Sequence, residues 1–256
     1  MNKSKIIEKI KGDPDLWDNL WREKNSSKSS FDKILFNTDT PDTLPQFRQK
    51  CYFEDLWNLI KQKNNYKKFL ELGSGRGTTS MYLSYNGIDD ITFVDLSTQG
   101  FKIATENFKK YNLKLPKFVE ADVQNTKLPS SSFDCIYNIG LLEHFLDPKP
   151  VLKEAFRLLK PGGLIFMVIV PKIPFYRSML ARLFLNPLPI HYFKSSLINI
   201  LQYLGYFKKR RLIRTSYPRS YYISMMKSIG AVNIDCLAYN PYHTVYYNRY
   251  LEKKIC

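Results

Sequence analysis

Short apolar runs alternate with amphipathic stretches through the middle of the chain. Each apolar run reads as a strand, and the stretch after it repeats its apolar positions at helical spacing. The expected strands are 67–73, 90–97, 116–123, the start of 132–145 and 164–171. The expected helices are one that runs to about Tyr85, one at 98–111 and one within 150–163 that Pro161 and two glycines stop. Strands that alternate with helices predict an α/β fold with a mainly parallel, doubly wound sheet, which binds ligands at the carboxyl ends of its strands.

The alternation stops after the fifth expected strand and returns near the C-terminus. Residues 172–218 hold two apolar, basic stretches, and we read this segment as an insertion before the last helix. Residues 220–231 then read as a helix, and 232–240 and 243–254 read as strands. These elements would complete a seven-stranded sheet with helices on both faces.

The N-terminal quarter of the chain does not share this pattern. Residues 1–65 are polar and helix-leaning, with a break at residues 25–30. Trp17 and Trp21 lie four positions apart and would share one face of a helix. Two interpretations stay open: the tryptophans dock the helix on the core, or the segment closes over a bound ligand as a lid.

Length and composition indicate a globular protein. A chain of 256 residues can bury a substantial core, and its longest apolar run, 164–170, is far too short to span a bilayer. The N-terminus lacks the apolar segment of a signal peptide, so we expect a cytoplasmic protein. The cysteines are scattered without CxxC spacing, so we expect reduced thiols and no metal site.

The net charge of +16 is unevenly distributed. Residues 155–234 contain 13 Lys or Arg and no Asp or Glu, and such a field attracts anions. Within 172–218 the basic residues alternate with aromatic and aliphatic ones. We weigh three interpretations: a lid over the substrate, a lid that also contacts an anionic membrane surface, and a surface for single-stranded nucleic acid. The Leu and Ile content disfavours nucleic acid.

A glycine-rich turn, "FLELGSGRGTTSMYL", follows the first expected strand. Its glycines are Gly73, Gly75 and Gly77, whereas a dinucleotide-binding turn would need its third glycine at Thr78. Such a turn lets the backbone approach a ligand closely. Glu71 beside it suits a cationic cofactor and would repel a pyrophosphate. Both alternatives would place an acid at the end of the second strand, so that position does not discriminate between them.

Further positions make the pattern more specific. Asp95 ends the second strand and Asp122 the third, and "LLEH…LKPGG" follows at the expected distance. This arrangement resembles the class I S-adenosylmethionine-dependent methyltransferases, above all the branch with ubiquinone, menaquinone and small-molecule methyltransferases. The resemblance is good over 67–171, loose over the last 35 residues and hardly present elsewhere.

The resemblance implies an architecture and a cofactor. It implies a Rossmann-like core at 66–171. From the pattern along the chain we expect an N-terminal helical cover at 1–65, a substrate-pocket insertion at 172–218 and a C-terminal helix with two strands at 219–256. The cofactor would be S-adenosylmethionine and the product S-adenosylhomocysteine. The residues expected to bind it are Glu71, Gly73, Ser74, Gly75, Gly77, Asp95, Leu96, Asp122, Val123, Asn138 and Ile139. Asp95 would accept both ribose hydroxyls, and Asp122 would hold the adenine amino group.

The reaction and its acceptor are less determined by the sequence. His144 follows the fourth strand and is a candidate general base, with closing the site or contacting the cofactor as the alternative. Asn138 is not followed by the prolines of amine-directed nucleic-acid enzymes, and no Pro-Cys pair exists. We therefore expect in-line methyl transfer to a small, apolar or lipid-like acceptor. A nucleic-acid-directed methyltransferase, or a non-enzymatic nucleotide- or nucleic-acid-binding module, is the alternative.

Overall fold

A computed structural model gives the structure of the chain. It describes residues 14–26, 36, 39–41, 44–63, 65–169, 215 and 217–236. Of the predicted insertion at 172–218, only residues 215, 217 and 218 are among these, and the predicted strand at 243–254 lies outside them.

A parallel sheet of five strands forms the centre of the described residues. The strands are β1 (Phe69–Leu72), β2 (Ile91–Asp95), β3 (Lys117–Glu120), β4 (Phe133–Ile139) and β5 (Leu159–Val168), in the order β3-β2-β1-β4-β5. The chain runs outward from β1 to β3 and then returns to the other side of β1 at β4. This reversal confirms the predicted doubly wound fold, and such a switch point is where α/β sheets bind ligands.

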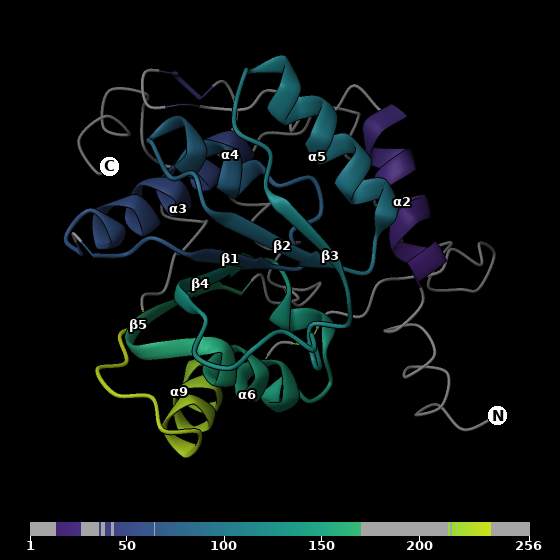
Figure 1. Ribbon diagram of the computed structural model, residues 1–256. Coiled ribbons are helices and arrows are strands. Elements are labelled where there is room, and N and C mark those ends of the chain that lie inside the picture. The colour runs from purple at the N-terminus through teal and green to yellow at the C-terminus, as the bar shows by residue number, and fades with distance from the viewer. Residues whose placement is uncertain are drawn as a thin grey trace, which may run out of the picture.

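Helices cover both faces of the sheet, as Figure 1 shows. On one face lie α3 (Leu44–Ile60), α4 (Thr78–Tyr85) and α5 (Thr98–Lys110), and on the other lie α6 (Lys149–Leu158) and α9 (Arg219–Ser228). Helix α2 (Pro14–Ser26) packs beside α5. Helix α2 therefore lies near the beginning of α5, where Asp18 contacts Ser97 and Gln99.

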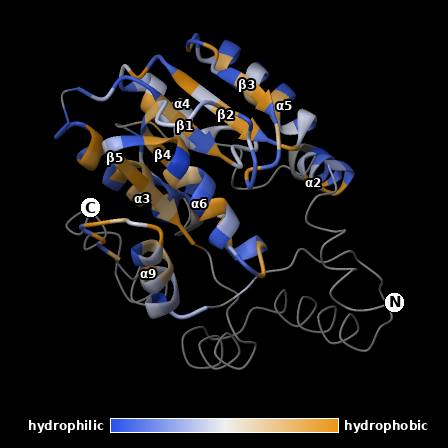
Figure 2. Ribbon diagram, turned by 60° about the horizontal axis from the view of Figure 1, so that its bottom comes forward, coloured by the Kyte–Doolittle hydropathy of each residue, from blue (hydrophilic) through white to orange (hydrophobic). Residues whose placement is uncertain are grey.

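Two hydrophobic clusters fill the spaces between the sheet and its helices. Successive residues of a strand face opposite sides, so Tyr137 of β4 joins one cluster and Ile136 joins the other. Helix α6 buries Val151, Ala155 and Leu158, which recur at helical spacing. Its outward residues are mostly hydrophilic (Figure 2).

The helix predicted within 150–163, with Pro161 and two glycines as its stop, ends a few residues before that proline. Helix α6 ends at Leu158, and the "LKPGG" stretch already belongs to β5. The residue before a proline is forced toward extended conformations, so Pro161 ends the helix early. Leu159 pairs with Phe133 instead, and a register shift follows before Leu164 pairs with Cys135.

The C-terminal elements are confirmed in part. The predicted helix at 220–231 is α9, but residues 232–236 are not in a strand, so the start of the predicted strand 232–240 is wrong. Val232 is 80% exposed, which is unlike a residue in the middle of a sheet. In the described part of the chain β5 is one edge strand of the sheet and β3 is the other. The seven-stranded sheet stays a prediction.

Candidate functional site

The glycine turn connects β1 to α4 at the switch point of the sheet. Gly73, Gly75 and Gly77 have φ angles of 63°, 50° and 69°, a backbone region that other residues adopt at a cost. Gly73 donates its N–H to the carbonyl of Val94 at 2.8 Å, which fixes the turn to β2. A Cβ on Gly73 would lie 2.7 Å from Leu141 Cδ1. The positive φ therefore disfavours any other residue at Gly73, and a side chain there would also force Leu141 to shift.

Asp95 joins the end of β2 to this turn. Its Oδ2 accepts the N–H of Gly75 at 2.7 Å, and its Oδ1 accepts the N–H of Ser97 at 2.8 Å. Burial raises the pKa of Asp95, and these N–H donors oppose that rise. A carboxylate oxygen accepts more than one hydrogen bond, so both oxygens can still receive a ligand's hydroxyl groups.

Glu71 lies in a buried polar group between β1, α4 and β4. Ser80 donates its hydroxyl to Glu71 Oε2, and the same hydroxyl lies 2.6 Å from Tyr137 Oη. Burial raises the pKa of Glu71 to about 8, although hydrogen bonds from Ser80 and Thr79 oppose the rise. The carboxyl group that we expected beside the turn is thus held by the helix that follows the turn.

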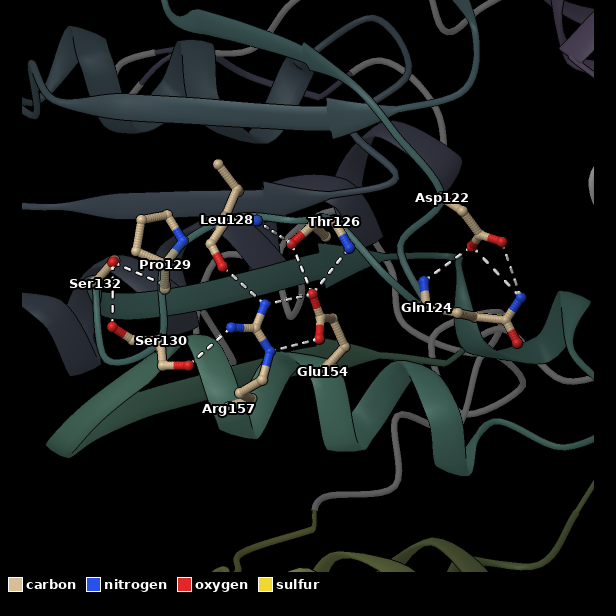
Figure 3. A network of polar contacts seen from close by, with 9 residues as sticks. All are labelled: Asp122, Gln124, Thr126, Leu128, Pro129, Ser130, Ser132, Glu154 and Arg157. Atoms are coloured by element: carbon tan, nitrogen blue, oxygen red, sulfur yellow. Dashed lines mark hydrogen bonds and ion pairs between the residues drawn. The ribbon is translucent and has the colours of Figure 1, made fainter.

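Asp122 does not end a strand, in contrast to the prediction. Strand β3 ends at Glu120, and Asp122 lies in the loop beyond it, where its Oδ1 accepts the N–H of Gln124 at 2.9 Å (Figure 3). A short polar side chain that caps its own loop in this way ends a strand early. The loop still reaches the site, because Ala121 donates its N–H to the carbonyl of Asp95 at 3.2 Å.

Two buried polar side chains at the site lack partners in the described part of the chain. Asn138, near the carboxyl end of β4, is fully buried, and neither of its amide atoms has a hydrogen-bond partner there. The same holds for the hydroxyl of Ser74 in the glycine turn. Buried polar groups are normally paired, so these two positions fit a bound ligand.

The remaining expected cofactor residues lie at the ends of three strands. Leu96 follows β2 and is half-buried. Ile139 ends β4 and packs against the hydrophobic cluster that contains Tyr137. Val123 lies in the loop after β3 and is buried in the hydrophobic cluster that contains Ile136. The sheet topology thus gathers the predicted residues at the carboxyl ends of the strands.

His144 lies in a short 3₁₀ turn, Leu142–His144, directly after β4. Its imidazole is buried, with Nε2 4.0 Å from Glu143 Oε1. Thr215 donates its N–H to the carbonyl of Glu143 at 2.7 Å, so the segment before α9 is tied to this turn. The ring of Trp17 meets His144 edge-on, with ring centroids 5.2 Å apart.

The sequence left open whether the segment with Trp17 and Trp21 docks on the core or closes over a ligand, and it did not identify the residues that α2 contacts. A Cβ on Gly75 would overlap the six-membered ring of Trp21, so the indole lies directly on the glycine turn. Between the two tryptophans, Asp18 accepts a hydrogen bond from Ser97. The spacing of Trp17 and Trp21 indicated a shared face, but nothing in the sequence indicated what that face contacts.

Residues 70–167 match the family model described as "Methyltransferase domain". A ubiquinone biosynthesis O-methyltransferase of Idiomarina loihiensis is 33% identical over 39% of this chain and 41% of its own length. Another, from Actinobacillus pleuropneumoniae serotype 5b, is 32% identical over 42% of this chain and 48% of its own length. The match confirms the predicted resemblance over the central part of the chain, which spans less than half of these relatives.

A solved structure supports the fold as a whole. The YcgJ protein from Bacillus subtilis superposes with a TM-score of 0.52 at 19% identity, covering 79% of this chain and 81% of that protein. The described helices include none that is long and apolar enough to cross a membrane.

Proposed function

We propose that this chain, whose residues 70–167 form a methyltransferase domain, transfers a methyl group from S-adenosylmethionine to a hydroxyl group of a small, apolar acceptor. The observation that carries the proposal is the hydrogen bond between Gly75 N–H and Asp95 Oδ2, 2.7 Å long. It joins the glycine turn and a carboxylate into one unit at the switch point, where a nucleoside-bearing cofactor needs both.

The residues present fit this cofactor. Gly73, Gly75 and Gly77 carry no side chains, so a ligand can contact the backbone of the turn wherever the neighbouring rings and Leu141 leave it uncovered. Asp95 keeps acceptor capacity for two ribose hydroxyls. Asn138 and Ser74 offer buried polar atoms that lack partners in the described chain. We assign the adenine side to Asp122, with the apolar residues Leu96, Val123 and Ile139 beside it.

In the reaction the chain accepts a proton, places a carboxylate beside the charged imidazole and excludes water. When bound, S-adenosylmethionine supplies a methyl group whose carbon–sulfur bond breaks as the acceptor oxygen bonds to it, leaving neutral S-adenosylhomocysteine. His144 accepts the hydroxyl proton of the acceptor at a ring nitrogen, Glu143 lies beside the imidazole that becomes charged, and the buried surroundings exclude water.

Two lines of support favour an apolar acceptor with a hydroxyl group. The relatives named above are O-methyltransferases of ubiquinone biosynthesis. The acid-free stretch 155–234, with 13 basic residues among apolar ones, suits a surface that reaches a lipid-like acceptor at an anionic membrane. A non-enzymatic nucleotide-binding module would not require a buried His144 beside the proposed cofactor site.

Calorimetry with S-adenosylhomocysteine tests the cofactor assignment. Asp95→Ala should weaken binding by about 10- to 100-fold, the loss expected for charge-assisted hydrogen bonds. Asp90→Ala is the matched control, because Asp90 precedes the same strand at its other end and pairs with Lys117 at 2.7 Å. Wild-type protein that binds NAD but no S-adenosylhomocysteine would refute the assignment.

Methyl transfer is then measured with methyl-labelled S-adenosylmethionine and three series of acceptors. Alkyl phenols and catechols represent the hydroxyl class, and alkylamines and alkylthiols of equal chain length represent the competing classes. We expect organic-extractable label only with the hydroxyl series, and more with longer alkyl chains. Label in the amine or thiol series alone would contradict the assigned acceptor.

A further inference from the structure

Asp18 attaches helix α2 to the beginning of helix α5. Its Oδ1 accepts the hydroxyl of Ser97 at 2.6 Å and the N–H of Gln99 at 3.0 Å, and its Oδ2 accepts the hydroxyl of Thr98 at 3.2 Å. The first N–H groups of a helix lack partners within the helix, and they favour a negative charge. Burial raises the pKa of Asp18, but these hydrogen bonds outweigh it and lower the pKa below its ordinary value.

Ser97 connects this attachment to the proposed ribose-binding carboxylate. The hydroxyl of Ser97 donates to Asp18, while its backbone N–H donates to Asp95 Oδ1 at 2.8 Å. One residue thus contacts both carboxylates. The position of α2 and the orientation of Asp95 are set by the same short segment.

The attachment places two aromatic rings over the site. Trp21 lies on Gly75, and Trp17 lies against His144 with ring planes at 80°. The rings are one helical turn apart, so a single helix face spans the cofactor turn and the candidate base.

The tryptophans do not serve as the buried anchor of the helix. Both are only half-buried, whereas Leu16 is the residue of α2 that joins the buried set in the described chain. Trp17 and Trp21 instead contact His144 and the glycine turn.

We propose that α2 is part of the methyl-transfer site, with Trp21 contacting the bound cofactor, Trp17 positioning His144 and Asp18 holding both rings in place. The proposal rests on the proposed function and adds residues from outside the family match at 70–167. The Trp21 ring covers the backbone of Gly75, so a ligand bound beside the glycine turn contacts this ring. An aromatic ring also attracts a nearby cation.

Calorimetry with S-adenosylhomocysteine tests Asp18 and Trp21. Asp18→Ala and Trp21→Ala should each weaken binding about tenfold or more, the change that a loss of 1.4 kcal/mol produces. Asp15→Ala is the matched control, because it removes the same charge from an exposed position of the same helix. Thermal unfolding confirms that each variant is folded before binding is compared.

The outcomes separate this proposal from the function it rests on. If wild-type protein binds S-adenosylhomocysteine and both variants bind it equally tightly, α2 is only a structural helix and the proposal is overturned. If the wild type itself does not bind, the proposed function fails and this proposal fails with it. Weakened binding in Asp18→Ala and Trp21→Ala, with a normal Asp15→Ala, supports the proposal.

Trp17 is tested by turnover with the acceptor that the labelled assay identifies. Trp17→Ala should lower kcat about tenfold or more with little change in the KM for S-adenosylmethionine, because it misplaces the base without touching the cofactor. Trp17→Phe keeps an aromatic edge against His144 and should restore most of kcat. Equal kcat values in wild type and Trp17→Ala would overturn the positioning role.

Discussion

Arg157 forms a two-point ion pair with Glu154, with Nε 2.8 Å from Oε2 and Nη2 2.8 Å from Oε1 (Figure 3). The same carboxylate accepts the N–H of Thr126 at 2.9 Å and its hydroxyl at 2.7 Å. Arg157 also donates to the carbonyl of Leu128 at 2.9 Å. The pair therefore fastens the loop after β3, which contains Asp122, to helix α6.

Glu154→Gln should destabilise the protein by about 2–3 kcal/mol, because it removes a buried charge that several donors bind. The hydrogen bond from Arg157 leads the causes that lower the pKa of Glu154 to about 2. A lowered pKa adds stability above the ordinary value near 4.5, and this stability is lost as the pH falls toward 2. Denaturant unfolding at pH 7 and at pH 2 to 4 should show the difference from wild type shrinking in acid.

Glu106→Gln is the control for this prediction, since Glu106 is exposed on α5. It should match wild type at every pH. A Glu154→Gln variant that is also as stable as wild type at pH 7 would show that the pair only compensates its own desolvation.

Glu71 should make the cofactor-free protein less stable as the pH rises. The folded pKa of about 8 lies above the ordinary value of 4.5, so the folded state retains a proton that the unfolded chain releases. Between these values the free energy of unfolding should fall by up to about 1.4 kcal/mol per pH unit through this group alone. Glu71→Gln, which keeps a neutral side chain beside Ser80 and Tyr137, should remove that slope in denaturant titrations from pH 5 to 9.

Glu120→Gln serves as the control, because Glu120 is an exposed residue at the end of β3. Its stability should follow the wild-type pH dependence. Parallel pH curves for wild type and Glu71→Gln would mean that Glu71 is already ionised in the folded protein at neutral pH.

The fold of the core was predictable because the local pattern of apolar residues indicates most of its strands and helices. Strands β1 to β4 lie within the predicted apolar runs, whereas β5 begins before its run and overlaps it. The order of the elements follows from their alternation. The errors lie where pairing with a residue distant in the sequence determines whether a segment forms a strand. Leu159 belongs to β5 because Phe133 pairs with it, and residues 232–236 have the composition of a strand without pairing as one.

The same division applies to the site. Gly75 and Asp95 were predicted from spacing, since turns and strand ends lie at fixed places in this fold. The partners of Glu71 were not, because Tyr137 reaches Ser80 from a strand 57 residues away. Nor could spacing show that Asp18 docks on Ser97 across 79 residues.

His144→Ala should separate chemistry from cofactor binding. If the imidazole accepts the acceptor's proton, its loss should lower turnover by about 10²-fold or more. Affinity for S-adenosylhomocysteine should stay near the wild-type value, because the turn and Asp95 are untouched. Unchanged turnover on the identified acceptor would assign His144 a structural role beside Trp17.

The acid-free stretch leads to a prediction about membrane surfaces. Its densest charge is the run Lys208, Lys209, Arg210 and Arg211, which follows an apolar sequence and lies outside the described residues. Each Lys or Arg near an anionic surface contributes about 1 kcal/mol, so such a run can convert transient contact into measurable partitioning. We expect the protein to sediment with vesicles of phosphatidylserine and phosphatidylcholine more than with phosphatidylcholine alone, and added salt should reduce the difference.

Replacing all four residues of this run with Gln should abolish most of the preference for anionic vesicles while leaving S-adenosylhomocysteine affinity unchanged. The control removes the same number of charges elsewhere, at exposed lysines of the described structure: Lys61, Lys63, Lys109 and Lys114. If only the loss of total charge mattered, both variants would lose vesicle binding equally, because long-range attraction depends on net charge. A selective loss in the 208–211 variant places the contact in the predicted insertion, and equal sedimentation of wild type with both vesicle types at low salt would refute a membrane role.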